Sequence, residues 1–330
     1  MQFSHSAIDK YRTCPRLYFL HYIERLRPII QKSPLFFGSL VDDVVGRIFL
    51  EKKVYLTPEE LDLSLKSTDD IIQETLAKWY EDEKLRFSQA DLDLSLFSEA
   101  DLAQCIARCK ELNLDVSEDS YKAFLDACKT QLKQDDFALD SECQLGYNSF
   151  FIKSLELKIG MFLPVVRKWF EGEVQETKSV QREVTLEDED DVITGYIDMI
   201  LIMKDGTEMV WDLKTSSRAY KENDANESPQ LTIYSEYARI PEVGFLVLQK
   251  NIRKREPRVR LQDIRGKITE EQSEKVFSEI TEIVDEIKSL DKEMSCFKKN
   301  LDSCGAWGGC QYRKFCKFGT EVGLERKEKK

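Results

Sequence analysis

The sequence predicts an α/β fold, in which a sheet is flanked by helices. The first observation is a change in the apolar period after residue 172, where helical spacing gives way to strand-like runs at 180–187, 192–203 and 208–214. The second is the return of helical spacing at 229–238 and 269–294. A chain of 330 residues can bury a sizeable core as one large domain or as two.

The first half of the chain predicts mainly helices. They cover residues 4–24, where Ser4 or Ser6 can act as the cap, then 38–50 and 155–172. Between them, residues 57–137 are charged and contain no Gly and only one Pro, Pro58. Such a composition is typical of helices and predicts an α-helical insertion.

The second half mixes strands and helices. Pro229 begins the helix at 229–238, residues 243–249 form a buried strand, and 269–294 form a long amphipathic helix. The residues after Met294 have the Cys and Gly content of a metal-bound loop. We expect the final residues, ERKEKK, to be disordered.

The stretch 194-TGYIDMILIMKDGTEMVWDLKTSS-217 predicts a β-hairpin that turns at Gly206. Each strand carries an acid, Asp198 or Asp212, and Lys214 shares a strand face with Asp212. Two clustered carboxylates repel each other unless a cation neutralises them, and Mg²⁺ prefers oxygen ligands. The alternative interpretation is a solvated hairpin face with one cross-strand ion pair.

Charge and cysteine usage limit the possible classes of protein. The 49 basic and 61 acidic side chains give a net charge of −12, so nucleic-acid contact must come from local basic runs such as 253–260 and 313–317. There is no apolar run of 18 residues and no visible signal peptide, so we expect a cytoplasmic protein with no membrane partner. Nine cysteines, an odd number, then favour thiols or metal ligands over disulfides.

The cysteines fall into two groups. Cys304, Cys310 and Cys316 form a C-x5-C-x5-C pattern among glycines, which needs a fourth ligand from distant Cys14 or local Cys296. The wide spacing favours an iron–sulfur cluster, with structural zinc or three unligated thiols as alternatives. We expect the remaining cysteines to be buried hydrophobic residues, namely Cys105, Cys109, Cys128 and Cys143.

Gln230 and Tyr234 lie four residues apart and share one face of the helix at 229–238. In isolation, this pair indicates an ordinary amphipathic helix with Tyr234 in the core. The pair follows shortly after the Asp-Leu-Lys strand, so the two motifs occur one after the other along the chain.

Five motifs occur in one order along the chain. They are S-x-S-x-I-x-x-Y-x-x-C-P-x-x-Y from Ser4, then G-Y-I-D, D-L-K-T-S, Q-x-x-x-Y and the cysteine triplet. This order resembles the RecB-like branch of the PD-(D/E)XK nucleases. The likeness is closest to iron–sulfur members, which include CRISPR-associated adaptation nucleases and the nuclease domains of recombination helicases. It covers roughly residues 1–50 and 160–318.

The resemblance implies a restriction-endonuclease-like core, made of a mixed sheet flanked by helices. Core residues 1–50 and 159–294 would be interrupted by the helical insertion at 51–158, and followed by a Cys-rich cluster loop at 295–318 and a tail at 319–330. The cysteines implied to hold a [4Fe–4S] cluster are Cys14, Cys304, Cys310 and Cys316.

The resemblance also implies the site residues. Asp198, Asp212 and the Leu213 carbonyl would hold Mg²⁺ or Mn²⁺, Lys214 would act on the attacking water, and Gln230 and Tyr234 would orient Lys214 or contact DNA. Glu183 is a weaker candidate for a supporting ligand. Family members often carry a metal-binding His where this chain has Asp42, with Asp43 beside it. An Asp can serve as a hard oxygen ligand in that place.

The implied function is a metal-dependent deoxyribonuclease, in particular an exonuclease, acting on single strands or duplex ends in DNA recombination, repair, replication or processing. One alternative is a subunit that trims DNA ends beside a helicase, recombination or integration partner. The other is a catalytically inactive DNA-binding relative, which the Asp at position 42 keeps open.

Overall fold

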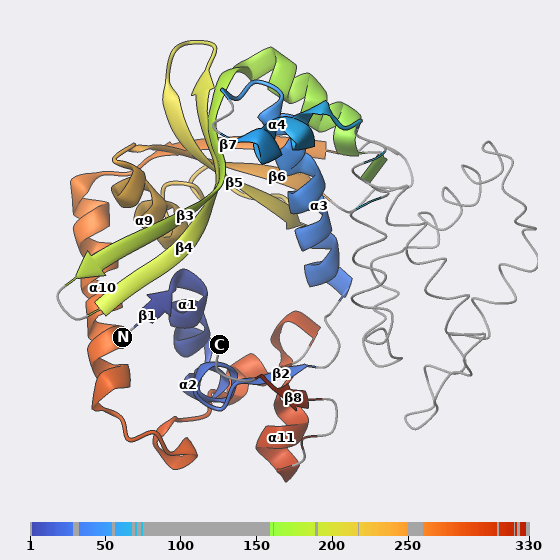
Figure 1. Cartoon of the computed structure of the whole chain (residues 1–330). Coiled ribbons are helices and arrows are strands. Elements are labelled where there is room, and N and C mark those ends of the chain that lie inside the picture. The colour runs from blue at the N-terminus through green and yellow to red at the C-terminus, as the bar shows by residue number, and fades with distance from the viewer. Residues whose placement is uncertain are drawn as a thin grey trace, which may run out of the picture.

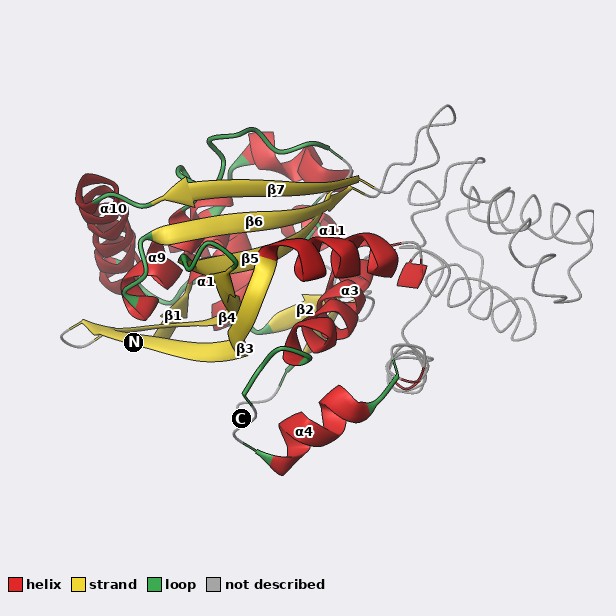
Figure 2. Cartoon of the chain, turned by 90° about the horizontal axis from the view of Figure 1, so that it is seen from above, coloured by secondary structure: helices red, strands yellow, loops and turns green. Residues whose placement is uncertain are grey.

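The protein is described here by a computed structural model (Figure 1). It describes residues 2–28, 33–54, 57–67, 70, 74, 159–160, 162–188, 191–216, 218–249, 260–308, 310–319, 321 and 324–327. A six-stranded sheet forms the centre of the described part, with helices on both of its faces (Figure 2). This arrangement confirms the predicted α/β class.

The sheet is mixed. Its strands are β1 (Gln2–Ser4), β3 (Val174–Asp188), β4 (Asp191–Met203), β5 (Glu208–Ser216), β6 (Glu242–Gln249) and β7 (Arg260–Lys267). They run in the order β1-β4-β5-β6-β7, and β3 also pairs with β4. The pairs β1–β4 and β5–β6 are parallel, whereas β3–β4, β4–β5 and β6–β7 are antiparallel. The predicted hairpin of β4 and β5 is therefore confirmed, with Gly206 at φ +87° in its turn.

Helices cover the two faces of the sheet (Figure 2) and pack there against its apolar side chains. On one face lie α3 (Ser33–Leu50) and a helix over 162–173, whose Trp169 ring meets Trp211 of β5 at 5.1 Å between centroids. On the other face, Val210 of β5 joins the core that is shared with α1 (His5–Thr13), α9 (Pro229–Ala238) and α10 (Glu270–Ser289). Successive residues of a strand point to opposite faces, so β5 contributes to the packing on both.

The single helix predicted over 4–24 is wrong, because Ser4 belongs to a strand and the chain leaves the helical conformation at Cys14. Ser4 ends β1 and caps α1 by accepting a hydrogen bond from the Ala7 N–H at 3.2 Å. Cys14 is extended, with φ −166°, and Pro15, which has no N–H, begins the next short helix. That helix is α2 (Pro15–Tyr18), which a π-helical turn, η1 (Phe19–Ile23), follows.

The C-terminal part packs against this N-terminal segment at the lower end of the molecule (Figure 1). It consists of η4 (Met294–Cys296), η5 (Leu301–Gly308), α11 (Arg313–Phe318) and β8 (Leu324–Arg326). Tyr312 is fully buried, and its hydroxyl donates to the Leu26 carbonyl at 2.8 Å. The two ends of the chain are therefore held together by a buried hydrogen bond.

The expectation that ERKEKK, residues 325–330, is disordered is wrong for residues 325 and 326. They belong to β8, which pairs antiparallel with β2 (Leu26–Pro28). Arg326 also pairs with the Glu24 carboxylate at 2.5 Å and with Glu321 at 2.9 Å. The ladder and these ion pairs give the charged tail partners that its composition did not reveal.

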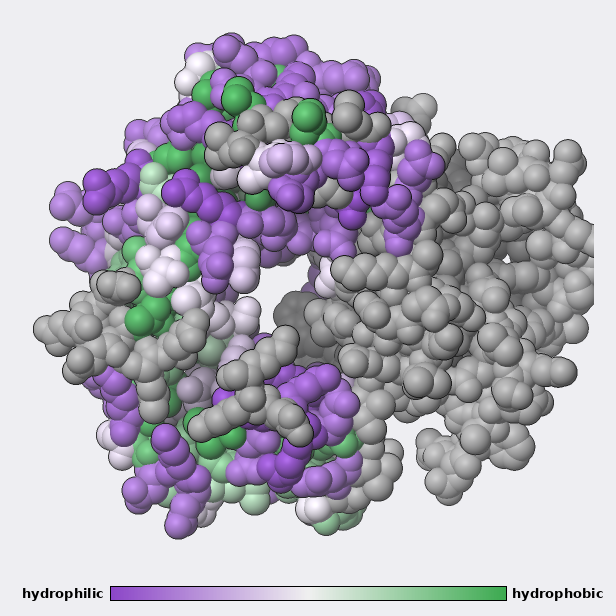
Figure 3. Space-filling model, in the orientation of Figure 1, coloured by the Kyte–Doolittle hydropathy of each residue, from purple (hydrophilic) through white to green (hydrophobic). Residues whose placement is uncertain are grey.

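Most of the predicted insertion lies outside the described residues, as do its four cysteines and the basic run at 253–259. The described piece, α4 (Pro58–Leu65), is helical. Within the described part of the chain, no helix has both the length and the apolar character needed to cross a membrane. The face shown in Figure 3 is mainly hydrophilic and is hollowed between the sheet and the part that carries α2 and α11.

Gly244 of β6 lies under the buried Trp211 ring, and a Cβ there would come within 2.5 Å of ring carbon atoms. We expect Gly244→Ala to lower the free energy of unfolding by about 1–3 kcal/mol, because a packed indole between two strands has little room to move. Gly172→Ala is the control, since nothing lies within 4 Å of its added methyl group. Urea denaturation of both variants tests this, and equal midpoints would contradict the packing argument.

Candidate active site

Strand β4 changes neighbours at the site. Residues 192–194 pair with β1 and residues 199–202 pair with β5, so 195–198, the G-Y-I-D motif, lie between the two ladders. Asp198 is the last of these residues, at the point where β4 and β5 separate. Its Oδ2 accepts a hydrogen bond from the Leu213 N–H at 2.8 Å. The side chain thus satisfies a strand N–H beyond the end of the ladder, which fixes the carboxylate beside β5.

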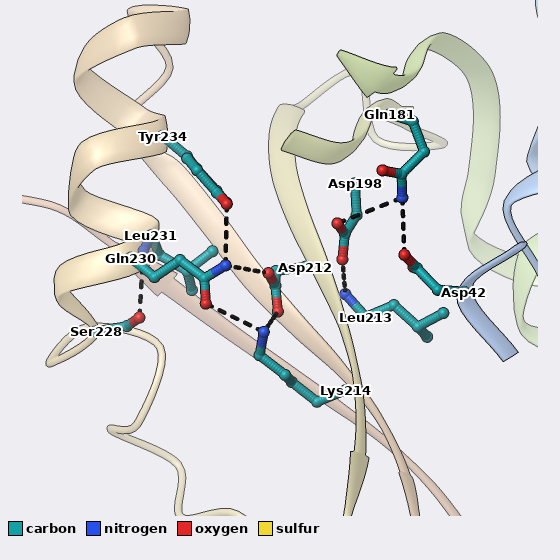
Figure 4. Close-up of polar contacts among 10 residues, drawn as sticks. All are labelled: Asp42, Gln181, Asp198, Asp212, Leu213, Lys214, Ser228, Gln230, Leu231 and Tyr234. Carbon is teal, nitrogen blue, oxygen red and sulfur yellow. Dashed lines mark hydrogen bonds and ion pairs between the residues drawn. The ribbon is translucent and has the colours of Figure 1, made fainter. Parts of the chain in front are cut away.

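Asp212 and Lys214 project together from β5, as the strand period predicts (Figure 4). Asp212 is 1% exposed and its Oδ2 lies 2.5 Å from Lys214 Nζ. Its Oδ1 accepts from Gln230 Nε2 at 2.9 Å, and Gln230 Oε1 in turn accepts from Lys214 Nζ at 3.1 Å. The amide of Gln230 therefore ties the buried acid to the lysine.

Helix α9 brings Gln230 and Tyr234 to this pair. Ser228 caps the helix by accepting from the Leu231 N–H at 3.2 Å, and Pro229 occupies its first turn. Gln230 Nε2 also donates to the Tyr234 hydroxyl at 3.0 Å. Tyr234 is 5% exposed, so it belongs to the core as well as to the hydrogen-bond network.

Gly195 leaves the space that Tyr234 occupies. A Cβ at Gly195 would lie 3.2 Å from Tyr234 Cε1 and 3.6 Å from its hydroxyl oxygen. The glycine of G-Y-I-D therefore lets the tyrosine of Q-x-x-x-Y lie against β4. The two motifs, far apart in the sequence, meet at this contact.

Asp42 reaches the site from α3, and Gln181 of β3 connects it to Asp198. Gln181 Nε2 donates to Asp42 Oδ2 at 3.0 Å and lies 3.5 Å from Asp198 Oδ1 (Figure 4). Gln181 carries no signal in the sequence, because it is one polar residue among several in an alternating strand. The two other acids considered as possible ligands, Asp43 and Glu183, are exposed. Glu183 lies opposite Tyr196 in the β3–β4 ladder and not opposite Asp198.

Burial and mutual repulsion dominate the electrostatics of the three acids. Burial, then Asp212 and Asp43, raise the pKa of Asp42 to about 6. Burial, then Asp212 and Asp42, hold the pKa of Asp198 well above its usual range. Burial also raises the pKa of Asp212, although Lys214 opposes this. Burial lowers the pKa of Lys214, but Asp212 and Asp198 reverse the effect and raise it.

Three acids around one lysine favour a bound cation. As they lie, however, they do not enclose a metal position, and the described residues contain no group of three or more His, Cys, Asp or Glu side chains placed to hold one. The Gln181 amide lies between the Asp42 and Asp198 carboxylates. The carboxylate oxygen atoms are the hard donors that Mg²⁺ and Mn²⁺ prefer, so their chemistry suits such an ion.

Cys14 lies against the C-terminal segment at the end of α1. Its Sγ accepts from the Asn300 N–H at 3.3 Å, while the Asn300 side chain and the Ser303 hydroxyl donate to the Thr13 carbonyl at 2.9 Å and 2.8 Å. Neighbouring Arg16 donates its Nε to the Phe297 carbonyl at 2.8 Å. Position 14 is thus joined to the C-terminal cysteine segment by direct hydrogen bonds.

The other cysteines lie in the same region. Cys304 Sγ approaches the Asn300 carbonyl at 3.7 Å, and the Cys310 N–H donates to the Cys304 carbonyl at 3.0 Å. Burial, then Cys310 and more weakly Cys14, raise the pKa of the Cys316 thiol. These cysteines and Cys296 are half-buried and form no disulfide.

Basic side chains of α1 and β2 lie beside one aromatic ring. Burial lowers the pKa of the neighbouring His5, which favours its neutral form, although Asp9 opposes this. Lys10 and the Arg27 guanidinium lie 5.6 Å and 5.8 Å from the centre of the half-buried Tyr22 ring. This acidic protein therefore has two cations gathered at one aromatic ring, Lys10 and Arg27 at Tyr22.

Comparison with known proteins gives one family. The model of the PD-(D/E)XK nuclease superfamily matches residues 2–317, which is most of the chain. No curated protein sequence matches it. Among solved structures, it is similar to one titled "Crystal structure of SSO0001", with 18% identity over 65% of this chain and 86% of that chain, and a TM-score of 0.26.

The raised pKa of Asp42 predicts a pH dependence of the metal-free protein. A carboxyl whose pKa is higher in the folded state contributes stability at low pH, which is lost as the pH rises from about 4 through about 6. The side chain of Asp42→Asn cannot ionise. We therefore expect the urea midpoint of the variant, minus that of the parent, to be larger at pH 8 than at pH 4.5. Asp285→Asn, at an exposed position of α10, is the control. A difference for Asp42→Asn that is the same at both pH values would contradict the assigned cause.

Proposed function

Because the chain belongs to the PD-(D/E)XK nuclease superfamily, we propose that Asp198, Asp212 and Lys214 form its active site and that it cleaves DNA from ends as a metal-dependent exonuclease. The observation that carries this proposal is the network around Asp212. In it, β4, β5 and α9 each contribute a motif residue within hydrogen-bond distance of the next. A network built only for stability would not need Asp212, which is 1% exposed, beside Asp198, whose pKa is raised.

Asp42, Asp198, Asp212 and the Leu213 carbonyl are the proposed ligands of Mg²⁺ or Mn²⁺. A bound ion of this kind polarises the scissile phosphate and lowers the pKa of a coordinated water. The three carboxylates supply the negative charge and the hard oxygen atoms that such ions prefer. Asp42 takes the place of the family's histidine, which keeps the site all-oxygen.

Lys214 is the proposed group that orients the attacking water and stabilises charge on the phosphate. Asp212 keeps Lys214 protonated and holds its ammonium at 2.5 Å. Gln230 fixes the same ammonium from the side of α9, and Tyr234 fixes Gln230. Gln230 and Tyr234 thus act as positioning residues for the lysine.

DNA is the proposed substrate, and two cations beside Tyr22, Lys10 of α1 and Arg27 of β2, support it. They would contact phosphates, and Tyr22 offers a ring on which a base can stack. Cleavage of linear but not circular DNA tests the exonuclease mode. A pull-down tests the further proposal of a helicase, recombination or integration partner.

The four cysteines, Cys14, Cys304, Cys310 and Cys316, are proposed to hold a [4Fe–4S] cluster. Their half-buried thiols, the hydrogen bond from the Asn300 N–H to Cys14 Sγ and the soft thiolate chemistry support this assignment. Such a cluster would be structural and would join the ends of the chain. A zinc ion on the same thiols is the alternative.

Substitutions at the proposed site test the function. We expect Lys214→Ala, Asp212→Asn and Asp198→Asn each to lower the cleavage rate of a labelled oligonucleotide by about 100-fold or more, because each removes transition-state or metal-binding charge. Lys221→Ala, an exposed lysine after β5, is the matched control and should cut at the parent rate. If all three site variants also cut at the parent rate, the active site lies elsewhere.

The cluster is tested by colour and metal content. Protein purified without oxygen should be brown and contain iron, and Ser in place of Cys14, Cys304, Cys310 or Cys316 should bleach it and lower its melting temperature. Cys296→Ser is the control that should stay brown. A brown Cys14→Ser protein beside a colourless Cys296→Ser protein would move the fourth ligand to Cys296, and zinc in every preparation would replace the cluster.

A further inference from the structure

Gln181 has a backbone conformation that its residue type does not favour. Its φ is +50°, in the left-handed region, although it lies within the long strand β3. For a residue other than Gly, Asn or Asp, this backbone conformation costs on the order of 1 kcal/mol. The pairs on either side, Val180–Met199 and Arg182–Ile197, keep the register of the ladder, so no register shift accounts for the conformation.

The side chain of Gln181 shows what this conformation achieves. It places the amide NH₂ group between Asp42 of α3 and Asp198 of β4, at 3.0 Å and 3.5 Å from their oxygen atoms (Figure 4). Without a cation, two close carboxylates need a hydrogen-bond donor between them, and the NH₂ group is such a donor. The strained residue thus holds two proposed metal ligands at one place.

We propose that Gln181 is a ligand switch: its NH₂ group bridges Asp42 and Asp198 in the metal-free protein, and its Oε1 becomes a further ligand when a divalent cation enters. An amide carries a donor and an acceptor on one carbon, so a half-turn of its terminal group exchanges them. Mg²⁺, Mn²⁺ and Ca²⁺ all accept amide oxygen as a ligand. This inference rests on the proposed metal site and adds a fourth side chain to it.

The amide bridge and a bound cation compete for the same two carboxylates. The space between two of the acids is filled by the NH₂ group, so cation binding must first break its hydrogen bonds. Gln181 therefore opposes binding as a donor and favours it as an oxygen ligand. Which effect is larger can be measured by substitution.

Mn²⁺ binding to the full chain without DNA, followed by electron paramagnetic resonance, is the experiment. We expect Gln181→Leu to weaken Mn²⁺ binding about tenfold or more, because the oxygen ligand is lost. Gln181→Glu should bind Mn²⁺ at least as tightly as the parent, but should melt at a lower temperature in chelator because a third carboxylate joins the pair. Thr185→Val, an exposed position on the same strand, is the control for the strand itself.

Gln181→Gly separates ligation from backbone strain. Glycine adopts positive φ without cost, so this variant should melt above Gln181→Leu in chelator and yet share its weak Mn²⁺ binding. Parent affinity in the Leu and Gly variants would overturn the proposal, and so would a Glu variant that binds as weakly as the Leu variant.

Asp212→Asn distinguishes this inference from the proposed function. If Asp212→Asn loses Mn²⁺ binding while Gln181→Leu keeps it, the metal site stands and the switch is refuted. If the parent binds Mn²⁺ no better than Asp212→Asn does, the metal site itself is refuted, and the switch with it.

Discussion

The burial of Asp212 is the constraint on which the arrangement of the site depends. A carboxylate in the middle of a sheet is costly unless its oxygen atoms are paired, and here Lys214 and Gln230 pair them. Gln230 can do so only because α9 packs where β4 and β5 separate. The same packing places Tyr234 over Gly195. The pairing of one buried carboxylate therefore depends on the positions of two strands and a helix.

Local patterns predicted the elements whose signals are local. The hairpin of β4 and β5, the helix from Pro229 to Ala238 and the shared face of Asp212 and Lys214 all follow from periods of two or 3.6 residues. Pro15 has no N–H and breaks the helix after Cys14, although the apolar spacing continues across it. β8 could not be predicted, because its partner strand lies almost 300 residues earlier.

The site divides in the same way. Motif order identified Asp198, Asp212, Lys214, Gln230 and Tyr234 as a group, and the fold places them within one network. Gln181 had no such signal, since its role depends on a positive φ and on Asp42, which lies 139 residues away. A contact between residues so far apart is a property of the tertiary structure and leaves no period in the sequence.

The hydrogen bonds of the N-terminal segment constrain the order in which the chain can mature. β1 pairs with residues 192–194, and the Thr13 carbonyl accepts hydrogen bonds from Asn300 and Ser303. A ribosome adds roughly 5–20 residues per second, so this segment waits tens of seconds for the last of its partners. During that time α1 has neither its strand nor its final cap, and its apolar residues Ala7, Ile8 and Tyr11 have no complete core to enter. Residues 2–13 are thus synthesised long before the partners that complete their contacts, and during this interval their apolar side chains are open to aggregation and to proteases.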